Sequence, residues 1–213
     1  MSWSVETRKG TAQELHDAPA PTLTEGGLVV FNKCERDALV LGSAQSVELV
    51  DPGALEASNV ELVKRSTGGG IVYIDAAADL WIDFYLPASD ERTQAHLEGS
   101  FDWLGHLWLE AIGETNLELS ISSSKPSSPT SESGLYCFGS PGFGEVCSAT
   151  HKIVGISQRR TRDFSKFQCL YSPTAGIGGL GLIGREPDET DWASAGLPDA
   201  DFVLESLTNQ LKL

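Results

Sequence analysis

Two segments of this chain carry residue types that bind and activate anions. Residues 64–73 read KRSTGGGIVY, in which Arg65 stands shortly before three consecutive glycines. Glycine lets a backbone approach a ligand closely, exposed N–H groups can cradle an anion, and an arginine can donate two hydrogen bonds to phosphate or carboxylate. By residue chemistry alone this is a generic anion pocket. The alternative is a glycine-rich hairpin turn whose arginine faces solvent.

The second segment, residues 151–160, reads HKIVGISQRR and places Lys152 at the start of a predicted strand, with Gly155 three residues later. A lysine followed by a small residue in this way can lie along an extended ligand. Five of the 15 basic residues fall in residues 151–166, namely Lys152, Arg159, Arg160, Arg162 and Lys166. In so acidic a chain this concentration indicates a local site for an anion. The alternative is a charged edge strand that resists aggregation.

A cysteine offers a different chemistry. Cys137 stands 15 residues before Lys152, and a thiolate beside a lysine has a lowered pKa and is nucleophilic at neutral pH. The alternative is a small buried side chain beside Phe138. The other cysteines are Cys34, Cys147 and Cys169, and no two of the four have the C-x-x-C spacing of a zinc knuckle or a thioredoxin site.

A third glycine motif is set aside. Residues 176–181 satisfy G-x-G-x-x-G and follow a predicted strand, but a dinucleotide site requires a helix to begin at the end of the motif. Pro187, Gly196 and Pro198 break the sequence that follows. We therefore expect a glycine-rich connecting loop.

His96 and His106 lie ten residues apart on a predicted helix, which is not the spacing of a metal pair, so we expect no metal held by side chains.

Length and charge limit the class of protein. The chain has 213 residues, 40% of them hydrophobic, and a net charge of −15. The length and the hydrophobic fraction suit one domain with a hydrophobic core. The negative net charge argues against nucleic-acid binding, which relies on positive charge. No stretch is apolar enough for a secretion signal or a membrane helix. Few cysteines and no signal lead us to expect a cytoplasmic protein.

The pattern of elements predicts an α+β fold, with a mixed or antiparallel sheet backed by helices. Residues 1–27 are expected to form a loosely held polar arm, and residues 28–213 the domain. Leu80, Ile82, Phe84 and Leu86 alternate and should share one face of a strand. A helix should begin at Ser89 or Asp90 and end at Gly113, with an apolar stripe of Leu97, Phe101, Leu104, Trp108 and Ala111. Other expected strands cover residues 28–31, 38–41, 60–65, 71–73, 146–148, 152–159 and 167–171, with a closing helix at 200–213.

Two irregular segments are also expected. Residues 42–59 should be loop-like. Residues 120–134 contain eight serines and two prolines and are predicted to be a flexible loop within the domain. The alternative for this loop is a lid that orders over a bound ligand.

Together the segments KRSTGGGIVYID (64–75) and THKIVGISQRR (150–160) resemble the lipoate–protein ligase family of the wider biotin/lipoate ligase superfamily. Its pattern reads approximately R-R-[ST]-G-G-G-x-V-x-H-D, followed by G-x-K-[IV]-x-G-S-[AS]-Q. Residues 38–45, ALVLGSAQ, look like the early LVLGRxQ strand of the family. The resemblance spans roughly residues 28–172 and implies a biotin/lipoate ligase-like catalytic domain in a short form, without the C-terminal accessory domain of longer ligases.

The resemblance implies an activity. Such ligases use ATP and Mg²⁺ to convert lipoate to lipoyl-adenylate. They then attach the lipoyl group to a lysine of a lipoyl domain, in the E2 component of 2-oxoacid dehydrogenases, or of the glycine-cleavage H protein. Lys152 would bridge the acyl carbonyl and the phosphate, and Val72, Val154 and Ile156 would help to line an acyl tunnel. The residues implied to bind the lipoyl-adenylate are Arg65, Gly68, Gly69, Gly70, Ile71, Val72, Tyr73, Gly155 and Ser157.

The chain departs from the family pattern at Ile74, which replaces a histidine, while Asp75 is retained. The resemblance also leaves alternatives open. Octanoyltransferases of this superfamily carry the acyl group on a cysteine, which they load from acyl carrier protein, and Cys137 is placed like the cysteine of one branch. A non-catalytic acyl- or adenylate-binding module is a further alternative. A biotin ligase is less favoured, because the lysine-strand motif looks lipoyl-type.

Overall fold

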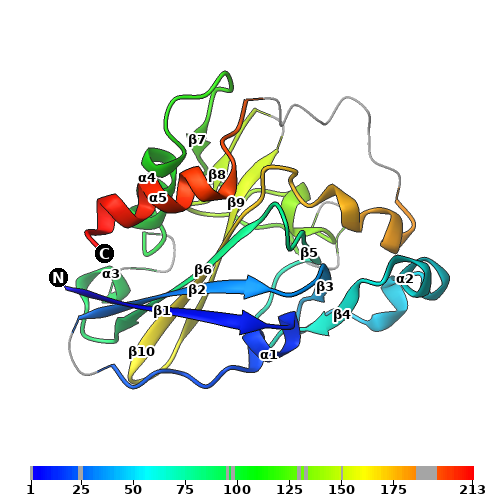
Figure 1. Ribbon diagram of the computed structural model, residues 1–213, viewed down its shortest axis with the longest axis horizontal. Coiled ribbons are helices and arrows are strands. Elements are labelled where there is room, and N and C mark those ends of the chain that lie inside the picture. The colour runs from blue at the N-terminus through cyan, green and yellow to red at the C-terminus, as the bar shows by residue number, and fades with distance from the viewer. Residues whose placement is uncertain are drawn as a thin grey trace.

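The structure is a computed structural model, and it describes residues 2–23, 26–94, 96, 99–128, 131, 134–149, 151–185 and 196–213. Within these residues two sheets lie side by side (Figure 1). The large sheet has seven strands in the order β1 (Trp3–Gly10), β2 (Gly27–Cys34), β6 (Leu80–Pro87), β10 (Phe164–Tyr171), β9 (Lys152–Arg160), β8 (Val146–Cys147) and β7 (Ser120–Ile121). The small sheet has three, in the order β4 (Glu61–Lys64), β3 (Ala38–Leu41) and β5 (Val72–Ile74).

Both sheets are mixed, which confirms the predicted α+β class. In the large sheet β1 pairs with β2 in parallel and the other pairs are antiparallel. In the small sheet β3 is parallel to β4 and antiparallel to β5. The helices are α1 (Ala12–Asp17), α2 (Pro52–Ser58), α3 (Glu91–Gln94), α4 (Asp102–Ile112) and α5 (Ala200–Leu211).

One face of the large sheet packs against α4 and α5, which lie together in Figure 1. The alternating residues of β6 face these helices, as their spacing predicts, because successive side chains of a strand point to opposite faces. Gly113 ends α4 as expected. A second hydrophobic cluster fills the space around the small sheet, and it includes Trp81 and Leu170 from the large sheet. The candidate site lies beside this second cluster.

The N-terminal arm expected over residues 1–27 is instead mostly regular structure. Strand β1 pairs with β2 along its whole length, from Trp3 opposite Gly27 to Gly10 opposite Cys34. Helix α1 begins with a capping box formed by Thr11 and Glu14 and buries Ala12 and Leu15. The segment looks polar because β1 is an edge strand and most of its side chains are exposed. An edge strand of this kind has no apolar alternation to reveal it.

Two further expectations are corrected. The single helix predicted from Ser89 to Gly113 is broken into α3 and α4, with the buried Ser100 between them donating a hydrogen bond to Gln158 of β9. Leu97 of the predicted stripe lies outside the described residues. Residues 42–59 contain the 3₁₀ turn η1 (Val47–Leu49) and α2, whose cap Asp51 precedes Pro52 in the first turn. That order of residues is itself a helix-start signal.

Among the described residues, three further 3₁₀ turns are η2 (Cys137–Gly139), η3 (Ile177–Gly179) and η4 (Gly181–Ile183). The glycine motif at residues 176–181 thus continues into 3₁₀ turns rather than an α-helix, which fits the expected connecting loop. In the Ser/Pro-rich segment, residues 129, 130, 132 and 133 lie outside the described residues. Over the part of the chain that the structure describes, no helix is long and apolar enough to cross a membrane.

Candidate active site

A cavity of about 600 Å³ brings the sequence motifs together between the two sheets. Its apolar wall comes from β3, β5, β6 and β10, and consists of Val40, Val72, Ile74, Trp81 and Leu170. Its polar wall comes from η2, β9 and residues 67–70, which we call the glycine loop. Residues 125–127 of the Ser/Pro-rich segment also line it, so the segment contributes to the cavity as the lid alternative requires. The cavity therefore has an apolar side and an anion-binding side.

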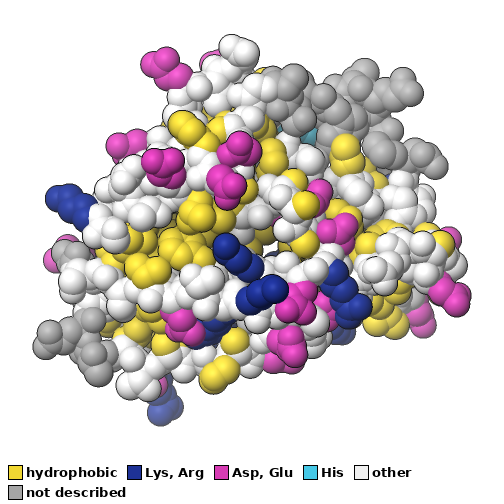
Figure 2. All heavy atoms as spheres, in the orientation of Figure 1, with side chains coloured by type: hydrophobic (Ala, Val, Ile, Leu, Met, Phe, Trp, Pro, Cys, Tyr) yellow, Lys and Arg dark blue, Asp and Glu magenta, His cyan; other side chains and the backbone are white. Residues whose placement is uncertain are grey.

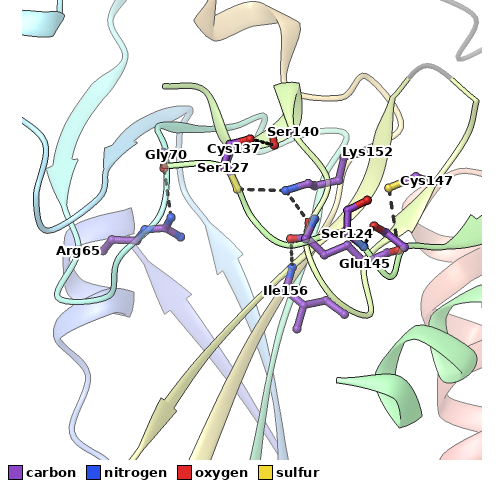
Figure 3. A network of polar contacts seen from close by, with 12 residues as sticks. Arg65, Gly70, Ser124, Ser127, Cys137, Ser140, Glu145, Cys147, Lys152 and Ile156 are labelled. Atoms are coloured by element: carbon purple, nitrogen blue, oxygen red, sulfur yellow. Dashed lines mark hydrogen bonds and ion pairs between the residues drawn. The ribbon is translucent and has the colours of Figure 1, made fainter. Parts of the chain in front are cut away.

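The glycine loop folds around a buried arginine. Arg65 follows β4, is 9% exposed, and donates from its Nη2 to the Gly70 carbonyl at 3.1 Å (Figure 3). Gly69 has a φ of 107°, which favours glycine, and a Cβ there would lie 2.7 Å from the Arg65 Nη2. Gly68, Gly69, Gly70 and Thr67 line the cavity together with Arg65. Positive charge and the loop backbone thus lie at one wall.

Backbone bonds fix the cysteine against this loop. The Cys137 N–H donates to the Ile71 carbonyl at 2.7 Å, and the Ile71 N–H donates to the Leu135 carbonyl at 2.8 Å. The side chain of Gln45 also donates to the Leu135 carbonyl. A Cβ on Gly70 would lie 2.8 Å from the Cys137 nitrogen, so glycine is required for this close approach.

A β-bulge explains why Lys152 and Gly155 face the same cavity. Residues three apart on a regular strand point to opposite faces. Here Val146 pairs with Val154 and Cys147 pairs with Lys152, so one extra residue of β9 is inserted between them. The position of a Gly155 Cβ is consequently only 3.7 Å from the Lys152 Cδ.

Lys152 lies between a thiol and a carboxylate (Figure 3). Its Nζ is 3.6 Å from the Cys137 Sγ and 2.7 Å from the Glu145 Oε2, and the side chains of Lys152 and Glu145 are 4% and 5% exposed. Burial lowers the pKa of Lys152, but the electrostatic interactions of its ammonium with Cys137 and Glu145 together outweigh burial and raise it. The lysine is therefore a charged hydrogen-bond donor at neutral pH.

The cavity collects most of the predicted site residues but not all of them. Ile71 and Tyr73, predicted to bind the ligand, have side chains outside its lining, because the alternation of β5 directs Val72 and Ile74 inward instead. Tyr73 donates its hydroxyl to Asp37 at 2.7 Å. For the predicted tunnel, Ile156 lines the cavity and Val154 does not. The predicted residues that do line it are Arg65, Gly68, Gly69, Gly70, Val72, Cys137, Lys152, Gly155 and Ser157.

Among the lining residues that sequence reasoning did not find, two bear on the electrostatics of the site, Glu145 and His16. Glu145 has no motif around it, and only the fold places it beside Lys152. His16 comes from α1, and its ring lies 4.6 Å from that of Trp81. Burial, together with the nearby charges of Arg65 and Lys166, lowers the pKa of His16 to about 3, so this part of the wall is uncharged. No group of three or more His, Cys, Asp or Glu side chains in the described residues is arranged to hold a metal.

The chain is similar to known proteins in sequence and in fold. A model of the lipoyl protein ligase A/B catalytic domain matches residues 22–175. No curated protein sequence matches the chain. A T. acidophilum protein solved with bound lipoic acid shares 15% identity over 100% of this chain and 86% of its own, with a TM-score of 0.70. Lipoate-protein ligase A bound with ATP gives 15% identity, the same two coverages and a TM-score of 0.68.

A further structure contains a bi-partite lipoate protein ligase and its E2 lipoyl domain from Thermoplasma acidophilum. It shares 14% identity over 100% of this chain and 84% of its own, with a TM-score of 0.67. At such low identity these structures show a common fold. Fold and site thus define an enzyme of the ligase and transferase class, built on the biotin/lipoate ligase fold. The chain belongs to the lipoyl protein ligase A/B catalytic domain family.

Two glycines of the site allow a test of this geometry. We expect Gly70→Ala to lower the free energy of unfolding by about 1–3 kcal/mol, because its Cβ would clash with fixed backbone atoms. Gly155→Ala has its nearest neighbours at 3.7 Å and should change stability by less than about 1 kcal/mol. Urea unfolding of both variants measures the difference. Equal losses would show that the Cys137 segment does not pack against Gly70 as described.

Proposed function

We propose that this enzyme attaches a lipoyl group to a lysine of an acceptor protein, through a lipoyl-adenylate made from lipoate and ATP. The observation that carries the proposal is the single cavity that joins an apolar wall to Arg65, the glycine loop and the buried Lys152. Such a cavity suits an apolar acyl chain that ends in a carboxylate and must meet a phosphate. The similar folds with bound lipoic acid and with bound ATP support the same ligands.

The chemistry has two steps. A lipoate carboxylate oxygen attacks the α-phosphorus of ATP, the bond to the β-phosphate bridging oxygen breaks, and pyrophosphate leaves. The acceptor amine then attacks the acyl carbon, and the bond from that carbon to the phosphate oxygen breaks, so that AMP leaves. The nitrogen loses one proton to solvent as the amide forms. Arg65 and the glycine-loop N–H groups would hold the phosphate, and Lys152 would donate to the reacting oxygens. Mg²⁺ would accompany the triphosphate.

The acceptor in this proposal is a lipoyl domain. A similar fold solved with an E2 lipoyl domain supports that choice, and the glycine-cleavage H protein is the other candidate acceptor. The exposed Arg159 and Arg160 at the end of β9, and Arg162 just after it, follow the cavity-lining Ser157 and Gln158. An acidic acceptor would meet positive charge there. The four cysteines are free thiols, which supports the expected cytoplasmic location.

The direct test is the intact mass of an apo lipoyl domain after incubation with the enzyme, lipoate and Mg-ATP. We expect a mass gain of one lipoyl group that requires ATP and the acceptor lysine. An acceptor in which that lysine is arginine is the control. No gain at any enzyme concentration would reject ATP-dependent ligation by this chain alone.

A second function is favoured by one observation, the 3.6 Å between the Cys137 Sγ and the Lys152 Nζ. In it, the Cys137 thiolate attacks the thioester of an octanoylated acyl carrier protein, the carrier thiol leaves, and the acceptor lysine then takes the octanoyl group. A nearby ammonium stabilises the attacking thiolate. The test is to incubate the enzyme with octanoyl-carrier protein in the absence of ATP and to measure the intact mass of the enzyme. We expect a mass gain of one octanoyl group on Cys137, which hydroxylamine removes because it cleaves thioesters.

Arg65 provides a prediction for the ATP-dependent function. Arg65→Ala removes a buried cation and the hydrogen bond to Gly70, so we expect weaker binding of the anionic ligand by about 1.5–3 kcal/mol. Calorimetric titration with lipoate and a non-hydrolysable ATP analogue measures the loss. Arg36→Ala is the matched control, since Arg36 is half exposed and outside the cavity. An unchanged affinity for Arg65→Ala would mean that the phosphate binds elsewhere.

A further inference from the structure

Glu145 is a buried carboxylate to which the proposed chemistry gives no role. It lines the cavity just before β8, and its side chain is 5% exposed. Its Oε1 accepts the Ile156 N–H at 3.0 Å, and its Oε2 accepts the Gly142 N–H and lies 2.7 Å from the Lys152 Nζ. Two backbone N–H groups thus hold this carboxylate in one orientation.

The contacts of Glu145 fix the direction of the lysine. An ammonium group has three N–H donors. One of them meets Glu145 and another faces Cys137, as Figure 3 shows. Rotation about the terminal bond of Lys152 is thereby restricted. The third donor is left to a substrate oxygen in the cavity.

The charge state of this lysine decides its chemistry. A neutral amine in the same place would be a nucleophile, and it would stand beside the activated acyl group that the enzyme makes. It would attack the acyl carbon, break the bond to the leaving group and form an amide on the enzyme itself. An ammonium has no free electron pair and cannot do so. A buried lysine with no counter-charge tends to lose its proton.

We propose that Glu145 is a positioning residue that keeps Lys152 a charged, oriented donor and so prevents the enzyme from acylating its own lysine. The inference rests on the proposed function, because it assumes an activated acyl group in the cavity. The other titratable groups facing the lysine are Cys137 of η2 and Cys147 of β8. Burial raises the pKa of Cys147 to about 11, so that thiol carries no charge near pH 7.

The test uses a small probe that does not depend on ligase activity. Wild type, Glu145→Gln and Glu145→Asp are treated with N-hydroxysuccinimidyl acetate between pH 7 and 10, and acetylation of Lys152 is followed by peptide mass spectrometry. We expect Glu145→Gln to acetylate Lys152 at least about tenfold faster near pH 8, since each unit of lowered lysine pKa raises the neutral fraction about tenfold. Glu145→Asp should restore part of the protection.

Glu61→Gln is the matched control, because Glu61 is another mostly buried carboxylate that accepts backbone N–H groups, those of Ala12 and Gln13, outside the cavity. It should leave Lys152 acetylation unchanged. Equal Lys152 rates in wild type and Glu145→Gln would overturn the proposal, whether or not the enzyme ligates lipoate.

A measurement on wild type covers the case in which Glu145→Gln does not fold. Acetylation of Lys152 should then begin at a higher pH than that of the exposed Lys33 in the same sample. A Lys152 that reacts at the same pH as Lys33, or below it, would contradict the proposal. If lipoate ligation fails while Glu145→Gln still exposes Lys152 to acetylation, the proposed function is rejected and the role of Glu145 in setting the lysine charge stands.

Discussion

Replacing Lys152 with methionine is expected to lower the rate of acyl transfer by about 10²–10³, the usual cost of removing one fixed donor from a reacting oxygen. Methionine keeps an unbranched apolar stem of similar length, so packing in the cavity is largely preserved. The single-turnover rate of lipoyl transfer to an apo lipoyl domain measures the effect. A loss in the rate constant rather than in lipoate affinity would place the lysine at the chemical step.

The Lys152 variant also breaks a buried ion pair, which leaves the Glu145 carboxylate unpaired and costs roughly 3–5 kcal/mol of stability. Lys166→Met is the matched control, since the Lys166 Nζ lies 2.9 Å from the buried Asp83 and Lys166 is not among the cavity residues. Lys166→Met should lose stability but keep its transfer rate. If both variants lose transfer equally, reduced stability alone explains the loss at Lys152.

Local patterns predicted the parts of the fold that bury a regular apolar face. The alternation of Leu80 to Leu86 and the strand expected at residues 152–159 follow directly from sequence spacing. The edge strand β1 and the short helix α1 escape this reasoning because few of their side chains are buried. Yet α1 supplies His16 to the cavity. A wall of the site therefore comes from a segment whose composition indicated only a polar arm.

The candidate site likewise contains residues that local sequence patterns predict and residues that only the tertiary structure places there. Arg65, the glycines and Lys152 belong to recognisable segments, and the structure brings them to one cavity. Glu145 could not be predicted, because its role depends on a tertiary contact with Lys152 and on two backbone N–H groups. The inward direction of Gly155 depends on a bulge in β9 that spacing does not reveal. Contacts that depend on three-dimensional pairing leave no local periodicity.

Replacing Cys137 with serine distinguishes the two proposed routes, because they predict very different acyl-transfer rates for this variant. Serine has nearly the same size, and the backbone bond from Cys137 to Ile71 is retained, so the fold should be unchanged. In the ATP-dependent route Cys137 takes no covalent part, and we expect transfer within about threefold of wild type, because the loss is limited to one weak contact with Lys152.

The thioester route predicts the opposite result for the same variant. Transfer from octanoyl-carrier protein should fall by about 10³ or more, because a serine hydroxyl is far less ionised than a thiol beside an ammonium. Cys34→Ser is the matched control, since burial raises the pKa of Cys34 to about 12 and it is not a cavity residue. The reaction is assigned by measuring the transfer rates of Cys137→Ser and Cys34→Ser with each acyl donor, that is, with lipoate and ATP and with octanoyl-carrier protein. Loss of ATP-driven transfer in Cys137→Ser alone would show that the lipoyl group passes through the cysteine after its activation, so that Lys152 and Glu145 serve a thioester intermediate.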